Sequence, residues 1–142
     1  MNLKDWIPTV LAFLSLFVFC QTLPAKEPVE ELATVASEVW LALADKGEYA
    51  ASWNEAAELF RAAMTEEQWR ATLSAFRKPL GKVLSRRLKL RRYTETLPGA
   101  PDGQYVVIQY ETVFEHKKFA IETVTPMLDR DGTWRVAGYY IK

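Results

Sequence analysis

The chain has 142 residues, of which 49% are hydrophobic and 25% charged, with 18 Lys and Arg residues balancing 18 Asp and Glu residues. This composition is typical of one globular domain, and a formal charge of zero gives no overall positive field for binding nucleic acid. One Cys and one His residue exclude disulfide frameworks and zinc sites built from these ligands. We therefore expect no metal, no cofactor and no nucleic-acid partner.

The N-terminus begins with a lysine-bearing segment followed by an uncharged apolar run over residues 9–20. This run is shorter than the roughly 20 residues that span a bilayer, and a proline and a small residue follow it. The pattern predicts a signal peptide over residues 1–25, cleaved between Ala25 and Lys26, which would place the mature protein in the periplasm or outside the cell. The alternative is an uncleaved inner-membrane anchor at residues 6–23.

The remaining residues, 26–142, divide by composition into two halves. Ala, Glu and Trp dominate up to about Phe76, whereas β-branched and aromatic residues dominate after Val83. Runs of helices followed by runs of strands are typical of α+β domains. The sequence predicts a single exported α+β domain over residues 26–142.

Apolar residues spaced three and four apart predict about three helices in the first half. Their stripes are Leu32, Val35, Ala36, Val39, Trp40 and Leu43; then Tyr49, Trp53, Ala56, Phe60 and Met64; then Trp69, Leu73 and Phe76. Thr65 and Gln68 match a capping box at the start of the third helix. Each stripe contains one tryptophan, and we interpret all three as core residues, because large aromatic residues at helical spacing usually pack inside.

Alternating apolar and polar residues predict four strands in the second half, near residues 84–91, 105–114, 119–128 and 134–141. Turns and one Pro- and Gly-rich loop between the strands favour a four-stranded antiparallel meander with the helices packed on the sheet. In the first strand, Arg87, Lys89 and Arg91 would form a basic outer face.

A turn around His116 that pairs Phe114 with Phe119 would fix the register of the central hairpin. The inner face of the sheet would then be apolar with hydroxyl groups. Its predicted members are Val106, Ile108, Tyr110, Thr112, Phe114, Phe119, Ile121, Thr123, Trp134, Val136, Gly138 and Tyr140. Four of them would line a shallow cavity for a small apolar ligand: Tyr110, Thr112, Thr123 and Tyr140.

The same register places Glu111 opposite Glu122 on the outer face of the sheet. Paired carboxylates can act as general acid and base, but an active pair needs a pocket, so we favour a solvated charge ladder on an open face. The predicted interaction face consists of Arg87, Lys89, Arg91, Glu111, Glu122 and Arg135.

Several strings along the chain carry a resemblance to a known family. They are Trp40-Leu41-Ala42-Leu43, residues 45–53, Pro79-Leu80-Gly81, residues 97–107, residues 114–117, residues 122–125 and residues 134–141. Together they resemble the bacterial domain-of-unknown-function family 4019. The resemblance implies an exported protein without an established activity. It also implies a cystatin-like or nuclear-transport-factor-2-like cone, in which a curved antiparallel sheet wraps a long helix.

Enzymes built on that cone usually hold ionisable groups inside it, whereas the predicted inner face here carries none except tyrosine. We therefore expect a non-catalytic domain that binds a small apolar ligand or an envelope protein. One alternative is a homodimeric assembly module of the cell envelope that uses the outer sheet face. Another is a small hydrolase or isomerase that uses Glu111 and Glu122.

Overall fold

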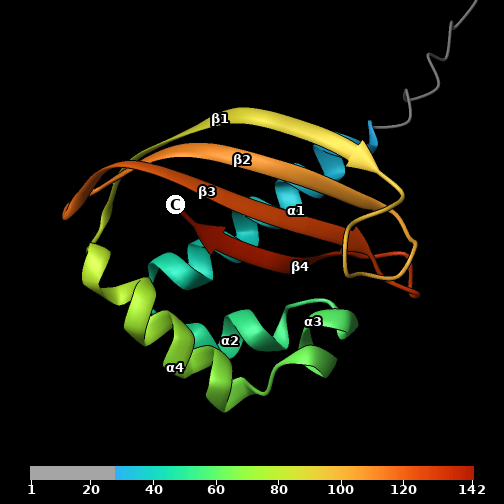
Figure 1. Ribbon diagram of the computed structural model, residues 1–142, viewed down its shortest axis with the longest axis horizontal. Coiled ribbons are helices and arrows are strands. Elements are labelled where there is room, and N and C mark those ends of the chain that lie inside the picture. The colour runs from blue at the N-terminus through green and yellow to red at the C-terminus, as the bar shows by residue number, and fades with distance from the viewer. Residues whose placement is uncertain (1–27) are drawn as a thin grey trace, which may run out of the picture.

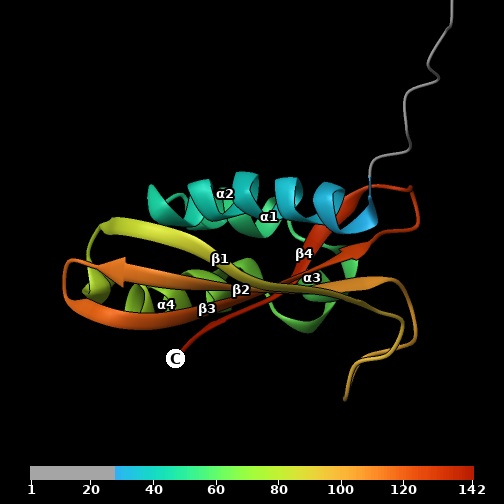
Figure 2. The same cartoon turned by 90° about the horizontal axis from the view of Figure 1, so that it is seen from above.

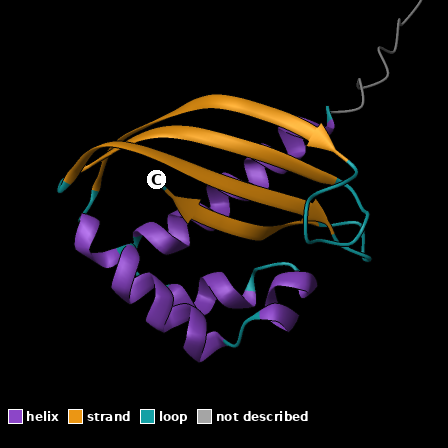
Figure 3. Cartoon of the chain, viewed as in Figure 1, coloured by secondary structure: helices purple, strands orange, loops and turns teal. Residues whose placement is uncertain are grey.

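The computed structural model of the protein describes residues 28–142. The predicted signal peptide, its cleavage site at Ala25 and Lys26 and the alternative anchor at residues 6–23 lie outside these residues. Helices come first and strands second, as the composition predicts (Figure 3). The elements are α1 (Val29–Asp45), α2 (Tyr49–Asn54), α3 (Glu58–Ala63), α4 (Glu66–Phe76), the 3₁₀ turn η1 (Lys78–Leu80), β1 (Val83–Thr94), β2 (Tyr105–Phe114), β3 (Lys117–Leu128) and β4 (Trp134–Ile141).

The four strands form one antiparallel sheet in the order β1-β2-β3-β4, which confirms the predicted meander and the α+β class. The sheet is open, with β1 at one edge and β4 at the other. Helix α1 runs along one face of the sheet (Figure 2). Helices α2, α3 and α4 lie together beside the β4 edge (Figure 1). We call the face covered by α1 the inner face and the opposite one the outer face.

Helix α1 is rotated relative to the stripe expected from its apolar residues. Small and hydroxyl residues such as Ala33 and Ser37 face the sheet, while Val35 and Val39 are 52% and 65% exposed. The hydroxyl of Ser37 donates to the carbonyl of Ala33 at 3.0 Å, so the side chain is buried without an unsatisfied polar group. Small side chains in the first half of α1 let the helix approach the sheet closely, and Leu32, Val35 and Val39 are left exposed.

The second predicted helix is divided into α2 and α3. Between them, the amide of Ala57 donates to the carbonyl of Val136 at 2.8 Å. The helix is interrupted where the backbone forms this hydrogen bond with the edge strand β4. Helix α4 begins at the predicted capping box. The amide of Gln68 donates to the Thr65 hydroxyl at 3.2 Å, and the amide of Thr65 donates to the Gln68 side chain at 2.9 Å.

The aromatic residues of the helices pack against β4. The ring of Tyr139 lies 5.3 Å from that of Trp40, and Phe60 contacts Trp69 edge-on at 4.9 Å. The indole N–H groups of Trp40 and Trp69 donate to the carbonyl and hydroxyl of Ser52 at 2.7 and 2.9 Å. Trp40 and Trp69 are 2% and 3% exposed, which confirms them as core residues.

The predicted register of the central hairpin is wrong by one residue. Phe114 pairs with Lys117 across a two-residue turn, and a bulge follows before Thr112 pairs with Ala120. Tyr110 therefore lies opposite Glu122. Because side chains alternate between faces, this single step moves every residue of β3 to the other side of the sheet. Glu122 faces inward and is fully buried, whereas Phe119, which was expected inside, is 90% exposed.

Candidate functional site

The four predicted ligand-binding residues do not share a face. Tyr110 and Thr112 face inward and are buried. Thr123 pairs with Tyr140 on the outer face, where Tyr140 is 49% exposed. The shared cavity expected from the sequence is therefore absent, because the corrected register separates its two halves.

Tyr110 belongs to the core beneath α1, at 2% exposure. Its hydroxyl has no hydrogen-bond partner among residues 28–142. Burial raises the pKa of this hydroxyl to about 12. The protonated form is thus the one that the fold accommodates.

The predicted interaction face is only partly formed. On the outer face, Arg87 and Lys89 contact Glu111, as the basic strand predicted. A bulge between Leu88 and Leu90 reverses the alternation, so Arg91 points to the helix side and pairs with Glu31 of α1 at 2.5 Å.

The two remaining members of that face are engaged elsewhere. Arg135 forms ion pairs with Asp129 at 3.1 Å and Asp131 at 2.8 Å, both in the turn before β4. Glu122 lies on the opposite side of the sheet from Glu111, so the two carboxylates do not face each other. The predicted carboxylate ladder, and with it the paired catalytic arrangement, is wrong.

Glu122 is instead the centre of a buried polar network inside the fold. Its carboxylate accepts hydrogen bonds from Arg86 Nε and Nη2 at 2.8 and 3.2 Å, from the Thr112 hydroxyl at 2.5 Å and from the Tyr139 hydroxyl at 2.5 Å. Burial and the charge of Glu122 raise the pKa of Tyr139 far above its ordinary value. Four hydrogen-bond donors from three side chains thus converge on one buried carboxylate.

The network continues from Arg86 to the end of α1. Arg86 holds Asp45 through two hydrogen bonds of 2.7 and 2.9 Å, and Arg77 donates to the same carboxylate at 3.0 Å. Burial alone would raise the pKa of Asp45, but Arg86 and Arg77 lower it below its usual range. Arg77 also donates to the carbonyl of Gly81 at 2.7 Å and lies over the ring of Phe114 at 4.6 Å. Alternating charges thus tie α1 to β1, β3 and the segment after α4.

Sequence reasoning missed this network. Arg86 lies next to Arg87 in the strand whose basic face we predicted to be solvated, and Asp45 lies at the end of the first helix, so nothing in the sequence pairs them. Because β1 faces α1 with Arg86 rather than Arg87, only the pairing of β1 with β2 shows which arginine turns inward.

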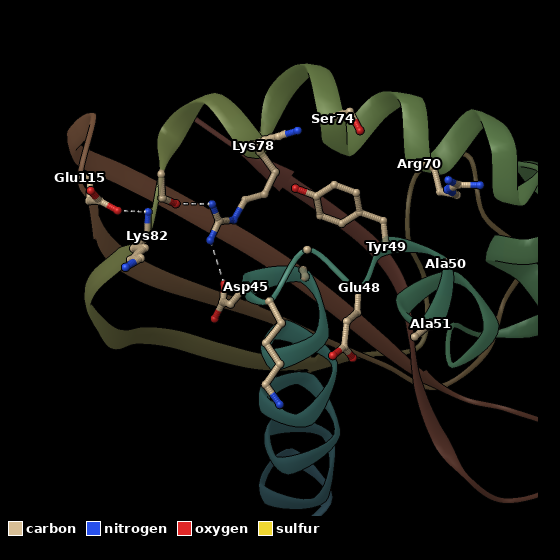
Figure 4. A pocket seen from close by; sticks show the side chains of 15 residues that line it. Asp45, Glu48, Tyr49, Ala50, Ala51, Arg70, Ser74, Lys78, Lys82 and Glu115 are labelled. Carbon is tan, nitrogen blue, oxygen red and sulfur yellow. Dashed lines mark hydrogen bonds and ion pairs between the residues drawn. The ribbon is translucent and has the colours of Figure 1, made fainter.

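A polar pocket of about 980 Å³ adjoins the network, between the turn from α1 to α2, helix α4 and the start of β1. Figure 4 shows Tyr49 lying between α2 and α4, below Lys78 and Ser74. Besides Arg77, four cations line the pocket: Lys46, Arg70, Lys78 and Lys82. None of these four forms an ion pair within residues 28–142. The carboxylates in the lining are Asp45, Glu48 and Glu115.

The pocket has the chemistry of an anion site with hydroxyl groups beside it. Unpaired Lys and Arg side chains attract carboxylate or phosphate groups, and the hydroxyls of Tyr49 and Ser74 can donate to or accept from a hydroxylated ligand. Within the described residues, no group of three or more His, Cys, Asp or Glu side chains is placed to hold a metal ion.

Comparison with family models matches residues 36–139 to the family described as "Protein of unknown function (DUF4019)". The match covers most of the chain, so the protein belongs to this family. No curated protein matches the chain. Among the helices of residues 28–142, none combines the length and apolar character needed to cross a membrane.

Proposed function

We propose that this member of the DUF4019 family is an exported, non-catalytic ligand-binding domain, and that the polar pocket is its site. The observation that carries the proposal is the group of four cations around the pocket that pair with no carboxylate of the described chain. A ligand that carries carboxylate or phosphate groups together with hydroxyls would supply the missing partners.

The base of the pocket favours binding because it is already ordered. Arg77 is 3% exposed and is fixed by Asp45, Gly81 and Phe114, so the wall that it forms cannot collapse when the pocket is empty. A preorganised wall reduces the entropy that a ligand must overcome.

The carboxylates of the network support a non-catalytic role. A general acid or base works best when its pKa lies near the working pH, and the pKa of Asp45 is shifted down, away from neutrality. The oxygens of Glu122 accept hydrogen bonds from Arg86, Thr112 and Tyr139, and Glu111 lies on the opposite face of the sheet. A hydrolase or isomerase based on this carboxylate pair therefore has no geometric support.

Native mass spectrometry of the full chain, expressed with its own N-terminus and recovered from the periplasmic fraction, tests export and ligand together. A mass that begins at Lys26 would confirm cleavage, and additional non-covalent mass would identify a cargo. Recovery only with the membrane fraction would contradict cleavage.

An NMR titration with citrate and with inorganic phosphate then tests the pocket. The double variant Arg70→Gln/Lys78→Gln should weaken binding of the probe at least about tenfold, because each cation contributes a charge-assisted hydrogen bond. Arg130→Gln, an exposed cation distant from the pocket in the turn before β4, is the matched control. Equal affinities of the double variant and the control would refute the site.

A homodimeric assembly module is the second candidate function, and one observation favours it. Leu32, Val35 and Val39 form an apolar stripe on α1 that is 44%, 52% and 65% exposed. A second copy could cover this stripe helix against helix. The variant Val39→Glu should then convert a dimer to a monomer in light scattering, whereas a parent protein that is monomeric at about 100 µM would exclude this route.

A further inference from the structure

Positive charge is concentrated at one end of the molecule. Residues 77–82, which lead into β1 at this end, contain three Lys and Arg residues and no Asp or Glu. This segment meets the β2–β3 hairpin, because the amide of His116 donates to the carbonyl of Leu80 at 3.0 Å and the amide of Glu115 to that of Lys82 at 2.9 Å. The hairpin adds Lys117 and Lys118 to the same end.

Large apolar side chains are exposed at this same end. Phe119 is 90% exposed and Phe76 is 73% exposed. Phe76 lines a groove together with Lys117 and Lys142, and Phe119 lines a second groove together with Lys118 and Lys142. Since Lys142 belongs to both grooves, the two aromatic residues and three lysines form one continuous surface. We call Phe76, Lys117, Lys118, Phe119 and Lys142 the tip surface.

The opposite end of the molecule carries charges of both signs, because Arg130 and Arg135 lie there beside four carboxylates. Asp129 and Asp131 lie in the turn before β4, and Glu95 and Asp102 lie in the loop between β1 and β2. The two loops are at the end of the sheet away from the β2–β3 hairpin (Figure 1). The tip surface itself carries three lysines and no Asp or Glu, so an anionic surface would attract it.

We propose that the tip surface docks on an anionic phospholipid bilayer. Phe76 and Phe119 would enter the interface between headgroups and acyl chains, while the lysines contact lipid phosphates. The exposure of Phe119 favours a membrane over a protein partner, because anchors of protein interfaces usually sit among supporting neighbours, whereas a fluid bilayer needs no matching shape. This surface is separate from the polar pocket, because none of the five residues of the tip surface lines that pocket.

Vesicle sedimentation of the full chain tests the proposal. Vesicles of 30% phosphatidylglycerol in phosphatidylcholine should bind the protein at least tenfold more strongly than pure phosphatidylcholine in 0.1 M NaCl, and 0.5 M NaCl should abolish the difference. Lys117→Gln/Lys118→Gln should weaken binding about 25-fold, since each basic residue near an anionic surface contributes about fivefold. Phe119→Ser should weaken it about tenfold.

Matched controls separate the tip surface from general charge and apolarity. Arg130→Gln removes an exposed cation from the opposite end, and Leu90→Ser removes an apolar side chain that is 45% exposed on β1. Both should bind anionic vesicles as the parent does. The proposal is overturned if these controls lose as much binding as the tip variants, or if the two lipid compositions bind the parent equally.

Hydrogen exchange supplies a readout that does not depend on any other membrane-binding segment of the chain. Anionic vesicles should slow exchange in the peptide around Lys118 and Phe119, and neutral vesicles should not. The proposal is overturned if vesicles slow exchange only in other peptides. It is also overturned if the parent binds no vesicles but binds an acidic protein that the tip variants fail to bind, because the surface would then belong to another ligand.

Discussion

Replacing Glu122 by glutamine should lower the free energy of unfolding by about 3–5 kcal/mol. The carboxylate is fully buried and accepts four hydrogen bonds, two from Arg86 and one each from Thr112 and Tyr139. A glutamine offers one oxygen, and its amide presents N–H groups to donors. At least two donors therefore lose their acceptor in a fully buried site, at about 1–3 kcal/mol each.

Guanidinium unfolding followed by tryptophan fluorescence measures this loss, because Trp40 and Trp69 pack against Tyr139. A domain of this size has a slope of about 3–4 kcal/mol per molar denaturant, so the midpoint of Glu122→Gln should fall by about 1 M. The matched control is Glu111→Gln, which removes a carboxylate paired with Arg87 on the solvated face, and its midpoint should stay at that of the parent.

A double-mutant cycle shows whether charge pairing is the cause. Arg86→Met should be strongly destabilising because it leaves the Glu122 carboxylate buried without a cation. Glu122→Leu should also be strongly destabilising because the hydroxyls of Thr112 and Tyr139 lose their acceptor and Arg86 keeps only Asp45. The double variant should cost clearly less than the sum of the two, while Asp45 keeps Arg77 as its partner. Strict additivity, or a shift for Glu122→Gln as small as for Glu111→Gln, would refute this account of the network.

Three further predictions follow from local geometry. Burial raises the pKa of Tyr110 in the folded state to about 12, above the ordinary tyrosine pKa of about 10, so Tyr110 contributes stability that is present below pH 10 and is lost as the pH rises toward 12. Tyr110→Phe should remove this component from alkaline unfolding curves. Gly81 has φ of +76°, and a Cβ there would meet the Cβ of Glu115 at 2.9 Å, so Gly81→Ala should cost about 2–3 kcal/mol in thermal unfolding. The control Gly132→Ala, with φ of +79° and open space, should cost only about 1 kcal/mol. Thr65→Ala should cost about 1 kcal/mol by circular dichroism melting, because it removes the hydroxyl that caps α4, whereas Thr65→Ser should not.

Much of the architecture follows from short-range patterns in the chain. The capping box at Thr65, the alternation that defines β2 and the turn-rich connections between strands each depend on residues a few positions apart. Spacing of this kind specifies helices and strands directly, so the α+β order and the meander could be predicted.

The spacing of apolar residues did not predict which side of α1 faces the sheet. Val35 and Val39 continue the apolar spacing but are exposed, whereas Ser37 is buried because its hydroxyl bonds to the carbonyl of Ala33. Hydrophobicity alone would predict that the two valines are buried and the serine is exposed. The fit of small side chains against the sheet decides which side of the helix is covered.

The sequence by itself determined the kinds of elements, their order and the aromatic core, because these depend on local periodicity and on apolar content. The tertiary structure decided which face each β3 residue occupies. A two-residue turn with a bulge, in place of the longer turn predicted around His116, shifts the hairpin by one position and brings Glu122 inside. Its partners Arg86 and Tyr139 are 36 and 17 residues away in the chain. A buried charge is tolerated only where such distant donors converge, and no local pattern records that convergence.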